Sequence, residues 1–419
     1  MRGINVDYQL SAEVSGVVRG RRFNFLLIEG SSPIRLDLEL ALRKRFPEAK
    51  VERLFPGNGQ PLHNLVWQHY DLVLASCPDF LDKDLAWLQA IERRDDGLPI
   101  VVALTPHDEA GRRAIWSGAD MYLLLEDSNV EFAARLDAVL EVGRMLRRYP
   151  LDLPDWHFVE VLHNSENAVI FLVENRAAQR AVIKRFKFDV SGMGQAAFAG
   201  FLHDAQLLSE IAHPCLARIW DVGVSGRAVY VVMEYVEGQT LASLLSGCGP
   251  DDFGIKLKWF RQVVEALGVI HSLGLLHRDL KASNVLVRDD GTPVLLDYGV
   301  ESKLLIGSGF LREDEIYCTP LYVSPERIVG EPASVQSDLY ALGVLLYEML
   351  AGEKPFVGRT LQEVLQRQLF DPIPTVPAAF AQYQALVNKL LAKLPDQRLD
   401  SAQAVLDWLN LGRLAEVAS

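Results

Sequence analysis

In its second half the sequence reads His277-Arg278-Asp279-Leu280-Lys281-Ala282-Ser283-Asn284, and Asp297-Tyr298-Gly299 follows 13 residues after Asn284. Transfer of a phosphoryl group needs a carboxylate that orients a hydroxyl, oxygen ligands for magnesium, and cations that neutralise the phosphates. The two segments supply an aspartate, a lysine two residues on, an asparagine five residues on, and a second aspartate beyond a strand hairpin. They therefore predict a phosphoryl-transfer site.

These segments resemble the catalytic loop and the magnesium loop of the eukaryotic-type protein kinases, which include the bacterial Hanks-type Ser/Thr kinases. Further motifs that resemble that family follow in the same order along the second half. They are Ala181-Val182-Ile183-Lys184, Met233-Glu234-Tyr235-Val236, the segment Thr319 to Glu326, Asp338 and Arg398. The resemblance implies a bilobal α+β protein kinase-like fold that uses ATP and Mg²⁺, or Mn²⁺ in its place.

The resemblance also implies a role for each matched residue. Asp279 would orient the acceptor hydroxyl, and Lys281 would neutralise the transferred phosphoryl group and favours Ser/Thr acceptors. Lys184 would hold the α- and β-phosphates, with Asp204 as its carboxylate partner. The implied metal ligands are Asn284 and Asp297. The residues expected to contact ATP are Ser165, Ala168, Ile170, Val182, Lys184, Met233, Glu234, Val236 and Leu286. By the same resemblance, Asp338 would anchor the catalytic-loop backbone, Arg398 would pair with Glu326, and the hydroxyl of Thr319 would contact Asp279.

The chain departs from the family at the first hairpin of this half. The family carries G-x-G-x-x-G there, and this sequence reads His163-Asn164-Ser165-Glu166-Asn167-Ala168. Glycine lets the backbone approach phosphates closely because it has no Cβ atom, and Glu166 adds negative charge. Two functions therefore stay open: a Ser/Thr kinase, or a pseudokinase scaffold that binds partners with or without nucleotide. The kept Asp279, Asn284 and Asp297 favour the kinase.

In the first half, short apolar runs alternate with amphipathic segments. The predicted strands are Phe23–Ile28, Val51–Phe55, Leu72–Ala75, Ile100–Leu104 and Met121–Leu125. The predicted helices are Leu36–Phe46, Leu62–Gln68, Leu81–Ile91, Ala110–Trp116 and Val130–Leu146. Five such βα units predict an α/β doubly wound parallel sheet with helices on both faces.

The run Gly118-Ala119-Asp120-Met121-Tyr122-Leu123 resembles the last strand of response-regulator receiver domains, which have the flavodoxin/CheY-like fold. A working receiver needs an acidic cluster, an acceptor aspartate and a lysine. Here the acceptor position has Leu74-Ala75-Ser76, and the lysine position has Leu124-Leu125-Glu126. Of the acidic cluster after the first strand only Glu29, followed by Gly30, is present, and Thr105 is kept. Asp71 lies at a strand start, where it is a poor acceptor. The sequence favours a pseudo-receiver used for contacts, and an unrelated flavodoxin-like module is the alternative.

The predicted organisation has five parts: a tail at 1–22, the receiver-like domain at 23–148, a proline-containing linker at 149–156, the kinase-like domain at 157–411, and a tail at 412–419. Partners cannot be named from the sequence. We expect a protein substrate, and either a signalling protein or a second copy bound through the receiver-like domain.

Composition excludes several classes of protein. The formal net charge of -13 argues against a nucleic-acid binder, and the 4 cysteines show no metal-binding spacing. Residues 1–11 lack the apolar core of a signal peptide, and the longest apolar stretch, Leu339–Leu350, is shorter than the roughly 20 residues that span a bilayer. We therefore expect a cytoplasmic protein with no membrane segment.

Overall fold

The computed structural model describes residues 23–29, 38–54, 69–76, 100–105, 108–116, 119–124, 136, 153, 155–165, 167–189, 199, 203, 209–225, 228–247, 252–297 and 319–417. The chain divides into two compact units, Met1–Arg180 and Ala181–Ser419. In the parts that the structure describes, no helix combines the length and the apolar character needed to cross a membrane.

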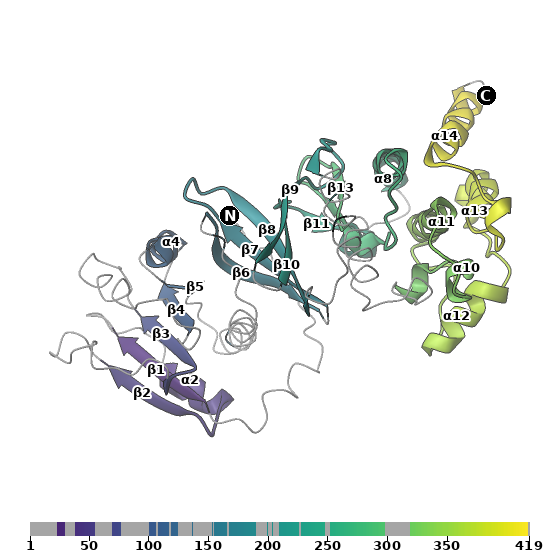
Figure 1. The fold of residues 1–419 in the computed structure, drawn as a ribbon. Coiled ribbons are helices and arrows are strands. Elements are labelled where there is room, and N and C mark those ends of the chain that lie inside the picture. Colours follow the sequence, from purple (N-terminus) through teal and green to yellow (C-terminus); the bar gives the residue numbers. More distant parts are fainter. Residues whose placement is uncertain are drawn as a thin grey trace. The chain divides into compact units, whose positions relative to one another are not determined.

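Five parallel strands form a sheet in the first unit, in the order β2-β1-β3-β4-β5 (Figure 1). The strands are β1 (Asn24–Glu29), β2 (Lys50–Leu54), β3 (Leu72–Ser76), β4 (Ile100–Thr105) and β5 (Met121–Leu124). Each overlaps one of the apolar runs in the sequence, which confirms the predicted parallel sheet.

Helices cover both faces of this sheet. Successive side chains of a strand point to opposite faces, so Phe25 and Leu26 of β1 pack against different elements. Phe25 contacts Phe46, which follows α2 (Leu38–Arg45), with ring centroids 5.4 Å apart. Leu26 shares a core cluster with Ala110 of α4 (Asp108–Trp116). The helices predicted at 62–68 and 81–91 lie outside the described residues, and of the helix predicted at 130–146 only Leu136 is described, as helical and buried.

A β-hairpin completes the first unit. It pairs β6 (His157–Asn164) with β7 (Ala168–Glu174), and β6 runs next to β5. Val159 of β6 packs against the core cluster of the parallel sheet. A residue that the sequence analysis assigned to the second domain thus contributes to the core of the first sheet.

The second sheet is antiparallel, with the order β6-β7-β8-β10-β9. Its strands from the second unit are β8 (Arg180–Asp189), β9 (Ile219–Ser225) and β10 (Ala228–Glu234). A smaller sheet joins β11 (Gln239–Thr240), β12 (Val285–Val287) and β13 (Pro293–Leu295). The hairpin β12–β13 separates Asn284 from Asp297, as predicted.

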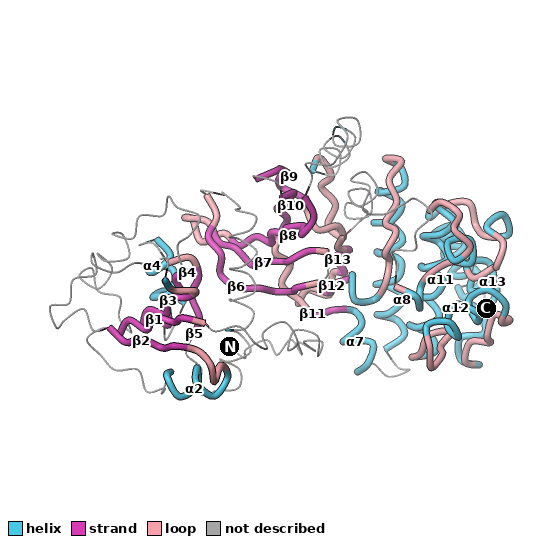
Figure 2. The backbone as a smooth tube through the Cα atoms, turned by 60° about the horizontal axis from the view of Figure 1, so that its bottom comes forward, coloured by secondary structure: helices cyan, strands magenta, loops and turns pink. Residues whose placement is uncertain are grey.

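Beyond its strands, the described part of the second unit consists of helices joined by loops (Figure 2). They are α7 (Leu241–Gly247), α8 (Phe253–Ser272), α10 (Pro325–Ile328), α11 (Val335–Ala351), α12 (Leu361–Phe370), α13 (Gln384–Leu390) and α14 (Ala402–Val417). Helix α11 is buried from Asp338 to Leu350, and α8 and α13 pack against it. It begins at a capping box on Ser334 and ends at Gly352, whose φ of 75° favours glycine. A strand-rich part followed by a helical part is the predicted bilobal order.

Candidate active site

Residues 277–284 form the loop between α8 and β12, and α11 fixes the start of this loop. Asp338, buried in the first turn of α11, accepts hydrogen bonds from the backbone amides of His277 (2.8 Å) and Arg278 (2.9 Å). Its Oδ2 also lies 2.9 Å from Nε2 of His271. Arg278 has a φ of 68°, which costs a non-glycine residue about 1–3 kcal/mol. The predicted anchor at Asp338 is confirmed, and it holds the loop in this strained turn.

Three side chains surround the carboxylate of Asp279. Nζ of Lys281 lies 2.7 Å from Oδ2, and the hydroxyl of Thr319 donates to Oδ1 over 3.0 Å. Nδ2 of Asn284 donates to Oδ2 (3.0 Å) and to the backbone carbonyl of Asp279 (2.8 Å). Lys281 also donates to the Thr319 hydroxyl over 2.8 Å. The predicted contact between Thr319 and Asp279 is therefore confirmed, and the carboxylate is held in one orientation.

The nitrogen and the oxygen of the Asn284 side-chain amide have different surroundings. Its nitrogen is used by Asp279, and its Oδ1, the atom that can ligate a metal, has no partner among the described residues. The short helix η6 (Ala282–Asn284) ends at this residue, so its backbone passes directly into β12. The residue thus couples the orientation of Asp279 to a position suited to a magnesium ion.

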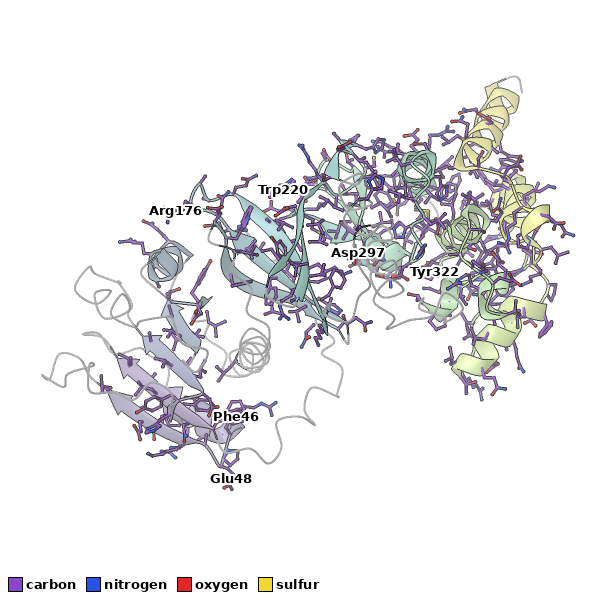
Figure 3. The ribbon with its side chains drawn as sticks, viewed as in Figure 1. Phe46, Glu48, Arg176, Trp220, Asp297 and Tyr322 are labelled. Carbon is purple, nitrogen blue, oxygen red and sulfur yellow. The ribbon has the colours of Figure 1, made fainter. Side chains whose placement is uncertain are left out.

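Asp297, labelled in Figure 3, lies two residues after the end of β13. Its Oδ1 is 3.0 Å from Nζ of Lys184, which lies on β8. Burial acts to raise the pKa of Asp297, but the charge of Lys184 and its hydrogen bond outweigh burial and keep the pKa below its ordinary value. Asp204, the predicted partner of Lys184, lies outside the described residues. A charged carboxylate at Asp297 is the state that binds a metal ion.

His277 supports the loop from inside. It is 1% exposed, and burial lowers its pKa although the carboxylates of Asp338, Asp279 and Asp297 act in the opposite direction. The imidazole is therefore neutral near pH 7, and its Nδ1 accepts the backbone amide of Asp279 over 3.3 Å. This position is structural, as expected from the sequence.

The part of the chain that forms this site matches a known protein family. The family model of the protein kinase domain matches residues 163–409, more than half of the 419 residues. The chain belongs to the protein kinase family. The match begins inside β6 and ends within α14, so it includes the catalytic loop, Lys184 and Asp297.

Bacterial serine/threonine-protein kinases are among the similar proteins. Pkn2 of Myxococcus xanthus is 37% identical over 221 residues, which is 50% of this chain and 26% of that protein. PknA of Mycobacterium tuberculosis is 31% identical over 241 residues, 56% of each chain. PrkC of Bacillus subtilis is 29% identical over 253 residues, 59% of this chain and 39% of that protein. The chain thus spans between about a quarter and just over half of the length of these relatives.

The hinge of the kinase domain is the segment that follows β10. Met233 pairs with Val182 across β10 and β8, so two of the residues predicted to contact ATP are neighbours. The amide of Glu234 donates to the carbonyl of Arg218 (2.8 Å), and the Glu234 carboxylate accepts from Arg288 over 2.7 Å. Arg288 follows β12, and no signal in the sequence analysis identified it.

Val236 and Leu286, two further predicted adenine contacts, belong to one packed group. Val236 is buried with Ala217 and Val294, and the half-buried Leu286 packs against them. The amide of Val236 has no partner among the described residues, so it is suited to bond a ligand. The structure therefore brings Val236 together with β12, the strand that follows Asn284.

In the hairpin that stands where the family has its glycine loop, two backbone amides form hydrogen bonds within the hairpin itself. The Ser165 amide donates to the Ala168 carbonyl over 2.9 Å, and the Ala168 amide donates to the Ser165 hydroxyl over 3.2 Å. Ala168 itself is 1% exposed, and Ile170 lies opposite His163 in the hairpin register. Glu166 lies outside the described residues. That Ser165, Ala168 and Ile170 contact ATP stays a prediction, but two of the amides that would cover phosphates are engaged within the turn.

The predicted ion pair between Glu326 and Arg398 is confirmed. Two nitrogens of Arg398 donate to the two carboxylate oxygens of Glu326, each over 2.7 Å. Burial acts to raise the pKa of Glu326, but the hydrogen bonds and charge of Arg398 hold it below its ordinary value. The pair fixes the start of α10, directly after the segment that carries Thr319.

Proposed function

We propose that the chain is a bacterial signalling Ser/Thr protein kinase that transfers the γ-phosphate of ATP to a protein hydroxyl. The observation that carries this proposal is the environment of Asp279, whose carboxylate is held by Lys281, Thr319 and Asn284. A side chain fixed in this way can accept a hydrogen bond from an incoming hydroxyl with little reorganisation. The kinase names of the bacterial relatives agree with this activity.

ATP and magnesium fit the residues that are present. Asn284 directs a carbonyl oxygen away from Asp279, and Asp297 is charged, so both can serve as hard oxygen ligands. Magnesium bound there would neutralise the charge that develops on the phosphates. Lys184 would exchange part of its contact with Asp297 for the α- and β-phosphates, and the Val236 amide would bond the adenine ring.

Within the transfer step, each polar residue has one task. Asp279 orients the acceptor hydroxyl and takes up its proton as the oxygen attacks the γ-phosphorus, and the bond from that phosphorus to the β–γ bridging oxygen breaks to release ADP. Lys281, 2.7 Å from that carboxylate, would stabilise the transferred group. Thr319 bridges Asp279 and Lys281, so the segment that follows the active site is coupled to the residues that act in the reaction.

For the first unit we propose a pseudo-receiver that acts by contact. The strand order β2-β1-β3-β4-β5 is that of flavodoxin-like doubly wound folds, which supports this assignment. The carboxyl ends of β1, β3 and β4 carry Glu29, Ser76 and Thr105 instead of an acceptor aspartate. The packing of Val159 against the core of the sheet supports a route by which a partner of the first unit could influence the hairpin β6–β7.

The alternative function is a pseudokinase scaffold, and one observation favours it. The amides of Ser165 and Ala168 are engaged within the hairpin, so this turn offers fewer donors to phosphates than a glycine loop does. A protein of this kind would bind nucleotide weakly or not at all, and partners would recognise its surface.

One experiment separates the two functions. The full chain is incubated with ATP labelled at the γ-phosphate, first with magnesium and then with excess chelator, and phosphoserine and phosphothreonine are quantified. The kinase predicts magnesium-dependent label on serine or threonine that disappears in Asp297→Asn. Label that persists in this variant would contradict the role of Asp297, and no label in wild type, with a generic protein substrate present, would favour the scaffold.

A further inference from the structure

The segment 319–322 is anchored residue by residue to three different elements. Thr319 contacts the catalytic loop through Asp279 and Lys281. The hydroxyl of Tyr322, labelled in Figure 3, contacts the carboxylate of Glu348 on α11. Between them, the carbonyls of Pro320 and Leu321 are bonded from α12. The second and third of these anchors do not touch Asp279, so they act on the site only through the position of the segment.

Gln368 supplies the anchor from α12. Its Nε2 donates to the carbonyl of Leu321 over 2.9 Å and to that of Pro320 over 3.4 Å. The residue is 0% exposed, although it lies on a short amphipathic helix whose other polar residues face solvent. A fully buried glutamine is uncommon, because every unmade hydrogen bond of its amide costs free energy.

Gln368 makes two further contacts, with residues outside the segment 319–322. The hydroxyl of Tyr340 on α11 donates to its Oε1, so the carbonyl oxygen of the buried amide also has a partner. Nζ of Lys393 donates to the backbone carbonyl of Gln368 over 2.7 Å. Both the side chain and the backbone of Gln368 are therefore held in place by residues outside the catalytic loop.

We propose that Gln368 is a positioning residue for phosphotransfer, acting through Thr319. The proposal rests on the kinase activity proposed above. The amide of Gln368 holds the backbone of the next two residues, so it determines where the Thr319 hydroxyl sits between Asp279 and Lys281. Loss of this anchor lets the segment shift while leaving every catalytic side chain present. A small displacement of this kind lowers a rate constant because the reacting groups must be aligned.

This role predicts a specific pattern of kinetics. Gln368→Met has similar volume but no amide, and we expect it to lower kcat on the order of tenfold to a hundredfold with an unchanged KM for ATP. Thr319→Val alone lowers kcat, and the double variant is no slower than Thr319→Val. Independent, multiplying effects in the double variant would show that Gln368 does not act through Thr319.

A matched control separates positioning from stability. Tyr340→Phe removes the other polar partner of Gln368 and leaves its two bonds to Pro320 and Leu321. We expect Tyr340→Phe to lower the urea midpoint about as much as Gln368→Met does, with kcat within about twofold of wild type. Equal losses of kcat in the two variants would overturn the proposal.

A second measurement does not depend on activity. The amide of Tyr322 donates to the carbonyl of Thr319 over 2.9 Å, so its hydrogen exchange reports the order of the segment. We expect faster exchange of this amide in Gln368→Met than in wild type or Tyr340→Phe. If wild type transfers no phosphate, the proposed function fails, and unchanged exchange in Gln368→Met is then the result that rejects the positioning role.

Discussion

In the first unit the carboxylates of Asp71 and Asp120 accept backbone amides, from Asn24 over 2.9 Å and from Val101 over 2.8 Å. In the second unit the carboxylate of Asp279 is held by three side chains, one of them a cation. Asp71 and Asp120 lie just before β3 and β5, at the amino ends of parallel strands. They tie neighbouring strands together and face away from the edge where a receiver carries its acidic cluster.

This difference shows that an aspartate acquires a chemical role from its partners. Asp338 makes the point inside the second unit, because it accepts the amides of His277 and Arg278 much as Asp71 and Asp120 accept theirs. Its task is structural although it lies beside the active site. A carboxylate that accepts amides supports the backbone, and one that faces cations and an open metal position can take part in a reaction.

The largest effect is expected at the buried ion pair of the second unit. Arg398→Met leaves Glu326 buried without its cation, which costs about 3–5 kcal/mol of unfolding free energy at pH 7. The exposed pair Arg367–Glu363 gives the matched control, and Arg367→Met should cost less than about 1 kcal/mol. Urea unfolding of the three proteins checks this, and similar losses in the two variants would contradict it.

The same pair predicts a dependence on pH. The pKa of Glu326 is held below its ordinary 4.5 in the folded protein, so the stability from this group is present above pH 4.5 and is lost as pH falls through the folded value. In Arg398→Met the carboxyl has no cation and protonates more readily. The gap in unfolding free energy between wild type and Arg398→Met should therefore narrow as pH is lowered from 7 toward 4.5. A constant gap over this range would show that the charge of Glu326 does not cause the loss.

A second large effect is expected at Lys281, which lies beside the carboxylate of Asp279. Lys281→Met removes the cation beside Asp279 and should lower phosphotransfer by about 10²–10³-fold without weakening ATP binding. Lys389, exposed on α13, is the control, and Lys389→Met should behave as wild type. Rates measured at saturating ATP decide the matter, and a variant with less than about threefold loss would remove Lys281 from the mechanism.

A moderate effect is expected at the hairpin shared by the first unit and the kinase match. Replacing His163, Ser165 and Ala168 by glycine removes the Ser165 hydroxyl that occupies the amide of residue 168, and should tighten ATP binding about tenfold. Ala178, with a φ of 59° at the other end of β7, is the control. Ala178→Gly should leave ATP affinity unchanged in calorimetry. Equal affinity of the triple variant and wild type would mean that the lost glycines do not limit binding.

The smallest expected effect is none at all. Ala75 is fully buried at the end of β3, and Ser76 follows it where a receiver has its acceptor aspartate. Acetyl phosphate should therefore produce no acyl phosphate in residues 23–148, measured by mass spectrometry before and after treatment with base. A base-labile phosphate there would show that the first unit also has a reactive carboxylate, which contradicts the difference between the two units.

The sequence predicted the elements whose pattern is local. The apolar runs of the first sheet could be found because their residue types and spacing suffice. The roles of the catalytic loop, Asp338 and Arg398 could be found because these residues match motifs of the protein kinases. Strand β9 shows no such regular pattern, because Gly223 interrupts it. A Cβ atom at Gly223 would lie 2.5 Å from the Tyr230 hydroxyl, so the Tyr230 side chain would have to shift for a larger residue to fit.

Other features could not be predicted because they depend on tertiary contacts. From the sequence, Gln368 would be placed on the polar face of an amphipathic helix. Its burial against Pro320 and Leu321 depends on tertiary contacts. Arg288 reads as a loop residue, and its ion pair with the hinge Glu234 joins residues 54 positions apart. Such pairs leave no periodic signal in the sequence.

The central claim is that the carboxylate of Asp279 in the second unit acts in phosphotransfer, while those of Asp71 and Asp120 in the first unit support its sheet. The most direct test is a pair of matched substitutions, Asp279→Asn and Asp120→Asn, each measured for phosphotransfer rate and urea midpoint in the full chain. The account predicts that Asp279→Asn loses at least about 10²-fold in rate with an unchanged midpoint. It predicts that Asp120→Asn keeps the rate and loses about 1 kcal/mol of stability. A wild-type rate in Asp279→Asn, or a loss of rate in Asp120→Asn as large as in Asp279→Asn, would contradict it.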